Sequence, residues 1–286
     1  MLSFTKKLLR TATVAVLTVG LGLSAAACGG SSETATSSSD DITQQTLTPG
    51  TLTVATGDPA YEPWVMDNDP STGKGFESAI IYALAEKLGF KKSQVKWTRS
   101  TFDTAIAPGA KDFDLNIQQF SVTPERKKAV DFSTSYYNDT TSIIVRKDSK
   151  YAKATSLADL KGATVGTMVG TNAYTQVKDK VDQNVQTFND DAALAQALDS
   201  GQIDALATST VECVYMVQSD QVKNGVVLGR INGSEEPDGM GIVLAKDSAL
   251  TKKVDTAMKS LIKDGTIKKL QDKWLAEYTT DVTVLK

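Results

Sequence analysis

The segment Ser121-Val-Thr-Pro-Glu-Arg-Lys-Lys-Ala-Val-Asp-Phe-Ser133 is the most informative stretch of the chain. Thr123 precedes Pro124, and a hydroxyl residue followed by proline is a common way to begin a helix. Arg126 follows within the charged run 125–128. A guanidinium can meet a planar carboxylate with two parallel hydrogen bonds. The pattern alone leaves two interpretations open: a carboxylate-binding arginine and an ordinary surface arginine.

On both sides of this segment, from Gly50 onward, short apolar runs alternate with amphipathic segments. The apolar runs predict strands at 52–55, 94–97, 115–117, 142–145, 164–165, 186–188, 203–207, 226–228 and 241–245. Apolar residues at helical spacing predict helices at 75–89, 190–200 and 249–264. Strands that alternate with helices favour an α/β fold with largely parallel sheets.

The N-terminal residues are typical of a targeting segment. A basic region with Lys6, Lys7 and Arg10 precedes an apolar run to residue 27, which is short for a membrane span. Small residues then lead into Cys28 and a glycine. They resemble a lipobox, although Ala25 stands where that motif usually has leucine, and the alternative is a plain secretory signal. We expect a lipoprotein signal peptide at 1–27, a lipidated Cys28 and a flexible Ser/Thr-rich tether at 28–49.

Composition excludes several kinds of site. The 286 residues carry a net charge of −3, and removal of residues 1–27, which hold three basic residues and no acidic ones, makes it −6. This balance gives no electrostatic reason to expect nucleic-acid binding. The chain has no histidine, which excludes Ser-His-Asp and Cys-His centres and histidine-ligated zinc. Two cysteines cannot form a cysteine-only metal site, so we expect neither a metal nor a cofactor, and Cys213 as a buried unpaired thiol.

Four segments, in this order, resemble one family: 74–81 (KGFESAII), 121–133, 156–166 followed by Gly170-Thr171, and 263–274 (KDGTIKKLQDKW). The chain is thereby identified as a member of the polar amino-acid-binding proteins of ABC importers, the bacterial extracellular solute-binding proteins of family 3. The similarity runs over nearly all of residues 50–276.

The resemblance implies a type II periplasmic-binding-protein-like α/β fold, in which two lobes joined by two hinge strands close on a ligand. By this analogy residues 50–137 plus 239–286 form lobe 1, and residues 138–238 form lobe 2.

The resemblance also implies how the ligand carboxylate is bound. Arg126 and the Ser121 hydroxyl would contact it from one lobe, and the helix start at Thr171 and Asn172 from the other, where backbone N–H groups favour an anion. A plain cap by Thr171 is compatible with this role.

Three further positions correspond to family residues around the ligand side chain: Asp58, Tyr61 and Phe102. Two aromatic rings can enclose a side chain, and Asp58 could accept hydrogen bonds from an amine or amide. Each also has an ordinary structural interpretation, since Asp58 precedes a proline as many turn residues do and Phe102 could belong to the core.

Two departures from the family concern the ligand's α-ammonium. Relatives usually carry an aspartate at the position of Ser209, and small residues at Gln118 and Gln119. Ser209 and the Gln119 carbonyl would supply neutral acceptors. Glu212 either completes a capping box with Ser209 or supplies the missing negative charge.

These observations predict an extracytoplasmic lipoprotein, anchored to the cell membrane only through Cys28. It would capture a polar amino acid and deliver it to an ABC permease without any catalytic residue. The alternatives are a dehydratase-like enzyme on the same scaffold, with Asp58 and Glu212 as an acid–base pair, and a ligand sensor.

Overall fold

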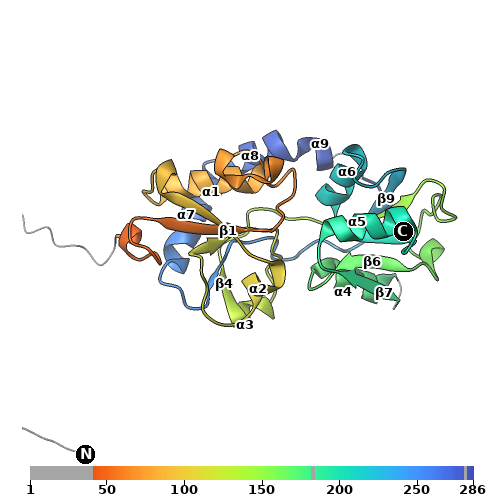
Figure 1. The fold of residues 1–286 in the computed structure, drawn as a ribbon, viewed down its shortest axis with the longest axis horizontal. Coiled ribbons are helices and arrows are strands. Elements are labelled where there is room, and N and C mark those ends of the chain that lie inside the picture. The colour runs from red at the N-terminus through yellow and green to blue at the C-terminus, as the bar shows by residue number, and fades with distance from the viewer. Residues whose placement is uncertain (1–40, 182–183, 280–281) are drawn as a thin grey trace, which may run out of the picture. The chain divides into compact units, whose positions relative to one another are not determined.

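The computed structural model describes residues 41–181, 184–279 and 282–286, which contain two mixed β-sheets (Figure 1). The five-stranded sheet has the order β2-β1-β3-β10-β4. Its strands are β1 (Leu52–Thr56), β2 (Val95–Arg99), β3 (Leu115–Asn116), β4 (Val130–Phe132) and β10 (Val243–Ala245). The six-stranded sheet has the order β11-β9-β5-β8-β6-β7. Its strands are β5 (Thr141–Arg146), β6 (Val165–Met168), β7 (Val185–Phe188), β8 (Ala205–Ser209), β9 (Gly225–Ile231) and β11 (Val284–Leu285).

Strand direction corrects the expectation of largely parallel sheets. β1 is parallel to β2 and β3, and β6 is parallel to β7 and β8. β10 is antiparallel to β3 and β4, and β5 is antiparallel to β8 and β9. Both β5 and β10 are the first strands after the chain passes from one sheet to the other. They do not follow a helical crossover within their own sheet, so nothing requires them to be parallel to their neighbours.

Helices pack on these sheets and bury their inner faces against them. They are α1 (Phe76–Lys87), α2 (Phe102–Ile106), α3 (Arg126–Ala129), α4 (Asn172–Lys180), α5 (Asp191–Ser200), α6 (Thr210–Gln218), α7 (Thr251–Lys263), α8 (Thr266–Trp274) and α9 (Ala276–Thr279). The three helices expected from apolar spacing correspond to α1, α5 and α7. In α1 the fully buried Phe76, Ile80 and Leu84 lie on one face, against α7 and α8. None of the helices in the described part of the chain has both the length and the apolar character that a membrane span requires.

Two segments connect the sheets, residues 133–140 after β4 and residues 232–242 after β9. They pair with each other where the Met240 N–H donates to the Tyr137 carbonyl at 2.7 Å. The last strand differs from the expectation that residues 239–286 belong with the first sheet. β11 pairs with β9, Val284 opposite Arg230, and so extends the six-stranded sheet. A two-residue strand has too little sequence pattern to be assigned to a partner in advance.

Candidate functional site

A cavity of about 90 Å³ lies where the two connecting segments meet the ends of both sheets. It is lined from the five-stranded sheet by residues after β1 and β3, and from the six-stranded sheet by the starts of α4, α5 and α6. The cavity is larger than a single water requires. That size fits one small polar molecule.

Ser121 and Gln119, both predicted to contact ligand, line the cavity on the side of the five-stranded sheet. Gln119 has a left-handed backbone with φ of 51°, which is uncommon for a residue with a side chain. Its conformation is held by Glu77 of α1, whose carboxylate accepts the Gln119 N–H at 2.8 Å and its side-chain amide. The Tyr136 hydroxyl donates to the same carboxylate. Burial raises the pKa of Glu77 to about 7. Glu77 therefore positions a cavity wall without lining the cavity.

Arg126 lies beside the cavity, and its guanidinium is not among the described groups that line it. Its Nη1 donates to the Ser121 carbonyl at 2.8 Å and its Nη2 to the Gly170 carbonyl at 2.7 Å. The guanidinium also lies 5.1 Å from the ring centroid of Phe102. Gly170 has a φ of 74°, a left-handed conformation that glycine adopts without strain. Arg126 thus connects the segment after β3 to the loop before α4, next to the predicted carboxylate site.

Thr171 and Asn172 line the cavity at the start of α4. The Thr171 hydroxyl donates to the Met168 carbonyl at 2.8 Å, and no side-chain cap to the helix N–H groups is formed. The compatible structural role expected for Thr171, capping through its side chain, is therefore not the one observed. The first N–H groups of this nine-residue helix remain open to an anionic partner.

Ser209 and Glu212 line the cavity at the start of α6. The Ser209 hydroxyl accepts the Glu212 N–H at 3.2 Å and caps the helix. The Glu212 carboxylate accepts the indole N–H of Trp64 at 2.9 Å, so the carboxylate spans from α6 to the five-stranded side. Ser209 therefore caps the helix through its hydroxyl. Glu212, whose carboxylate is directed to Trp64, lines the cavity, where it could supply a negative charge.

Four carboxylates line the cavity, and each is more than nine-tenths buried. They belong to Asp139 (4% exposed), Asp191 (8%), Glu212 (3%) and Glu236 (8%). Burial is the main cause that raises the pKa of all four, to about 7 for Asp139. No lysine or arginine occurs among the described residues that line the cavity. The cavity is therefore a strongly acidic environment.

Electrostatic interactions link these acids with one another. The negative charge of Asp191 raises the pKa of Glu212, and the neighbouring Ala192 N–H donates to the Tyr61 hydroxyl. Asp139 interacts electrostatically with both Glu212 and Glu236. Glu236 interacts electrostatically with Arg126.

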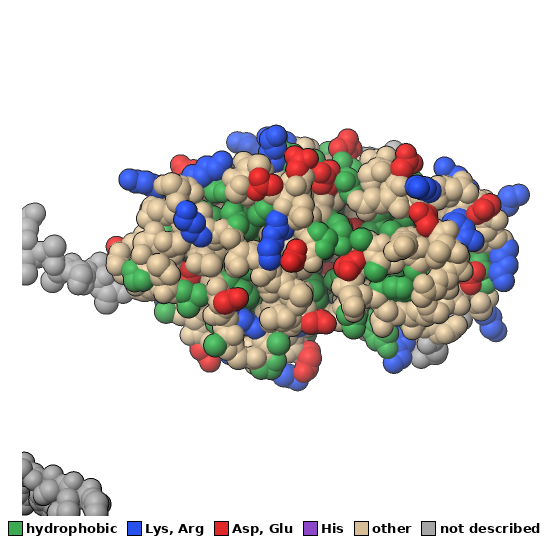
Figure 2. All heavy atoms as spheres, in the orientation of Figure 1, with side chains coloured by type: hydrophobic (Ala, Val, Ile, Leu, Met, Phe, Trp, Pro, Cys, Tyr) green, Lys and Arg blue, Asp and Glu red, His purple; other side chains and the backbone are tan. Residues whose placement is uncertain are grey.

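The concentration of acidic side chains is found in the cavity and not on the surface shown in Figure 2. On the face shown in Figure 2, acidic and basic side chains are interspersed over the surface. In the described part of the chain, no group of three or more Asp, Glu, Cys or His side chains has the arrangement of a metal site.

Of the three predicted side-chain contacts, Tyr61 and Phe102 line the cavity, whereas Asp58 is exposed and lies outside it. Phe102 also stacks on Phe120 with ring centroids 4.7 Å apart. Its structural and cavity-facing roles are thus both present.

Sequence reasoning missed Glu77, Asp139, Asp191 and Glu236. Asp139 and Glu236 come from the two connecting segments, and Asp191 from the first turn of α5. An acid at a helix start or next to a proline is commonplace on a surface. Only the burial of these side chains distinguishes them, and burial depends on the packing of distant segments.

The chain is similar to known proteins over most of its length. The family model described as bacterial extracellular solute-binding proteins, family 3, matches residues 52–277. The arginine-binding extracellular protein ArtP of Bacillus subtilis (strain 168) is 32% identical over 70% of this chain and 77% of its own. The L-cystine-binding protein TcyJ of Escherichia coli (strain K12) is 32% identical over 82% of this chain and 85% of its own.

Among solved structures, an ancestral arginine-binding protein bound to arginine is 30% identical to this chain. The two superpose with a TM-score of 0.65 over 79% of this chain and 98% of the ancestral protein. This confirms the fold that the resemblance implied. The chain belongs to the bacterial extracellular solute-binding proteins of family 3.

Proposed function

We propose that this protein captures a cationic amino acid, with arginine as the leading candidate, and delivers it to an ABC permease. The observation that carries the proposal is the set of four buried carboxylates around one small cavity without a lining lysine or arginine. Buried carboxylates are costly unless they are protonated or paired with a cation. A cationic ligand would pair with Asp139, Asp191 and Glu212 and exclude water in the same step.

The groups in and beside the cavity would provide a partner for each charge of such a ligand. Its α-carboxylate would contact the Ser121 hydroxyl, Arg126 and the N–H groups at the start of α4. Its α-ammonium would lie at Asp139, whose carboxyl is close to Ser209. Asp139 would then supply the negative charge that relatives have at the position of Ser209.

The cationic end of the ligand side chain would meet Asp191 and Glu212, with the Tyr61 ring beside it. Arginine appears in the names of ArtP and of the ancestral structure, which supports this class of ligand. The alternative of an Asp58–Glu212 acid–base pair has no such support, because Asp58 lies outside the cavity that Glu212 lines. The relatives named above are binding proteins.

Thermal unfolding tests the ligand class. A ligand that binds only the folded state stabilises it, and at a hundredfold excess over Kd the melting temperature rises by roughly 5–10 °C in a protein of this size. We expect arginine, and to a lesser extent lysine, to produce this shift, and glutamate and aspartate to produce none. A shift with glutamate equal to that with arginine would contradict a cationic specificity.

We also propose the two-lobe division, with one lobe built on each sheet and residues 133–140 and 232–242 as the hinge. Contacts from both lobes to one ligand would favour the closed form.

The membrane anchor is a further part of the proposal, and Cys28 lies outside the residues that the structure describes. Cys28→Ala should move the protein from the membrane fraction to the soluble fraction, because the proposed lipid is attached to the thiol of Cys28. Affinity for arginine should not change, since residue 28 belongs to the proposed tether. Fractionation followed by immunoblotting measures the first effect. Membrane retention equal to that of the wild type would contradict lipidation at Cys28.

A further inference from the structure

Glu236 occupies the end of the cavity assigned above to the ligand carboxylate. The Ser121 hydroxyl donates to its Oε1 at 2.5 Å, and the Asn172 side-chain amide donates to the same oxygen at 3.4 Å. Arg126 provides the nearby positive charge. Three residues predicted to bind a ligand carboxylate are therefore grouped around a carboxylate of the chain itself.

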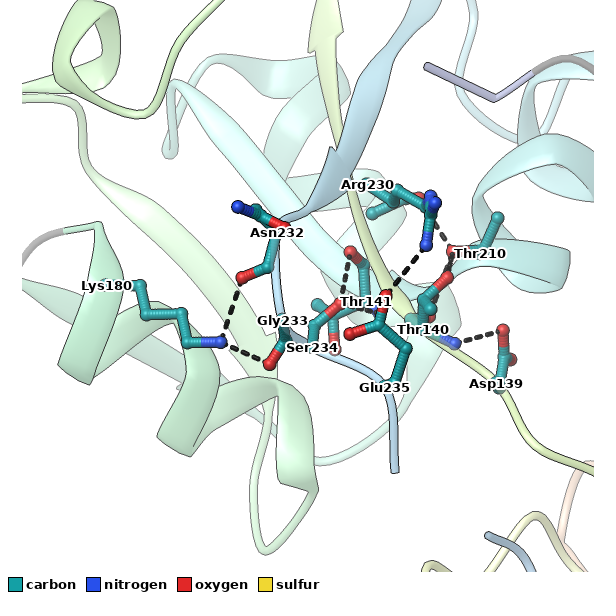
Figure 3. Close-up of polar contacts among 11 residues, drawn as sticks. Asp139, Thr140, Thr141, Lys180, Thr210, Arg230, Asn232, Gly233, Ser234 and Glu235 are labelled. Atoms are coloured by element: carbon teal, nitrogen blue, oxygen red, sulfur yellow. Dashed lines mark hydrogen bonds and ion pairs between the residues drawn. The ribbon is translucent and has the colours of Figure 1, made fainter. Parts of the chain in front are cut away.

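The backbone before Glu236 is fixed to the six-stranded side, as Figure 3 shows. Lys180 of α4 donates to the carbonyls of Asn232 and Gly233, at 3.0 and 2.5 Å. The Ser234 hydroxyl accepts the Thr141 N–H at 2.9 Å.

The neighbouring Glu235 forms an ion pair with Arg230 at 2.9 Å and points to the exposed side (Figure 3). Glu236 thus extends from an anchored segment into the cavity and reaches Ser121 across it.

The hydrogen bonds that the described residues make to the Glu236 carboxylate leave one of its oxygens without a donor, so a ligand carboxylate could replace it. The second oxygen of Glu236, Oε2, is buried and receives no hydrogen bond from the described part of the chain. A buried carboxylate oxygen without a donor keeps its desolvation cost. In addition, both terminal nitrogens of Arg126 donate to backbone carbonyls and none donates to Glu236. A free ligand carboxylate could receive two hydrogen bonds from Arg126 and more from the start of α4.

We propose that Glu236 is an internal competitor that fills the carboxylate subsite until a ligand carboxylate displaces it. The inference rests on the proposed function and adds a specificity determinant to it. A ligand with a carboxylate must displace Glu236, whereas a cation without one binds with Glu236 in place. In the unliganded protein the bond between Ser121 and Glu236 also joins the two sides of the cavity. Displacement enlarges the cavity by the space of a carboxylate.

The competing role for Glu236 is that of a counter-charge to the ligand's ammonium, through its unpaired Oε2. The two roles predict opposite effects of removing the carboxylate. An internal competitor lowers the affinity for amino acids, so its removal strengthens binding. A counter-charge raises that affinity, so its removal weakens binding.

Calorimetric titration of the wild type, Glu236→Ala and Glu236→Gln with arginine and with agmatine separates the two roles. Agmatine keeps the guanidinium and amine of arginine and lacks the carboxylate. We expect Glu236→Ala to bind arginine more tightly than the wild type, by about tenfold or more. A change of this size corresponds to the loss of one competing charge-assisted hydrogen bond. Glu236→Gln keeps an acceptor for Ser121 and loses the charge, so its gain should be smaller. Neither variant should bind agmatine more tightly. Glu235→Ala is the matched control and should match the wild type with both ligands.

Arginine binding that is unchanged or weaker in Glu236→Ala would overturn the inference while leaving the proposed function intact. If arginine binds neither the wild type nor Glu236→Ala, the proposed function fails. Small-angle scattering without ligand then tests the contact between Ser121 and Glu236. The radius of gyration should then be larger in Glu236→Ala than in Glu235→Ala. Equal values would overturn the inference as well.

Discussion

Arg126→Ala should weaken arginine binding by about 100-fold or more, since a charge-assisted partner of a buried carboxylate is worth several kcal/mol. Arg126→Lys should recover little of this loss, because one ammonium cannot reproduce the two parallel donors of a guanidinium. Calorimetric titration measures both. The side chain lies beside the cavity, with its nitrogens 2.8 and 2.7 Å from the carbonyls of Ser121 and Gly170.

The matched control is Lys128→Ala, which removes a positive charge from the same short helix at an exposed position. It should bind arginine as the wild type does. If Arg126→Ala keeps a wild-type affinity as well, the guanidinium only joins the two backbone segments, and the carboxylate subsite is assigned wrongly.

Glu212→Gln should weaken arginine binding by about tenfold to 100-fold, because it removes a buried charge next to the proposed guanidinium position. It should change citrulline binding much less, since citrulline has the shape of arginine with a neutral urea group. The glutamine oxygen can still accept the Trp64 indole N–H, so we expect the fold to be kept. Titration with both ligands gives the ratio of affinities.

Glu62→Gln controls for the loss of an acidic charge near α6. Glu62 accepts the Tyr215 hydroxyl of α6 at 3.0 Å and does not line the cavity. Its ratio of arginine to citrulline affinity should equal that of the wild type. An equal loss in Glu62→Gln and Glu212→Gln would show that general negative potential, and not a contact at Glu212, favours the cation.

The sequence predicted the fold well where elements are long and locally patterned. All nine expected strands are present, with ends that differ by a few residues, and α1, α5 and α7 lie where apolar spacing placed them. β4 and β11 were missed because three and two residues carry too little alternation. The direction of β5 and β10 depends on how the chain passes between sheets, which local pattern does not encode.

In the candidate site, residues that stand in family motifs could be named from the sequence, whereas most of the buried acids could not. Ser121, Arg126 and Thr171 stand in specific motifs, so their positions could be carried over from the family.

Asp139 and Glu236 stand in connecting segments without regular structure. Those segments pass each other at Tyr137 and Met240, and the burial of the two acids depends on this packing. The charge that Ser209 lacks was sought in Glu212 or Asp58, whereas the structure places Asp139 beside Ser209.

Titration of the wild-type protein with arginine and citrulline tests the central claim most directly. The ligands differ in one charge at the end assigned to Asp191 and Glu212. We expect arginine to bind at least about 100-fold more tightly at pH 8, as buried charge pairing requires. The ratio should fall at pH 6, because burial raises the pKa of Asp191 to about 7 and a protonated acid at this end no longer attracts the guanidinium. Equal affinities for the two ligands at pH 8 would contradict a site built for a cationic amino acid.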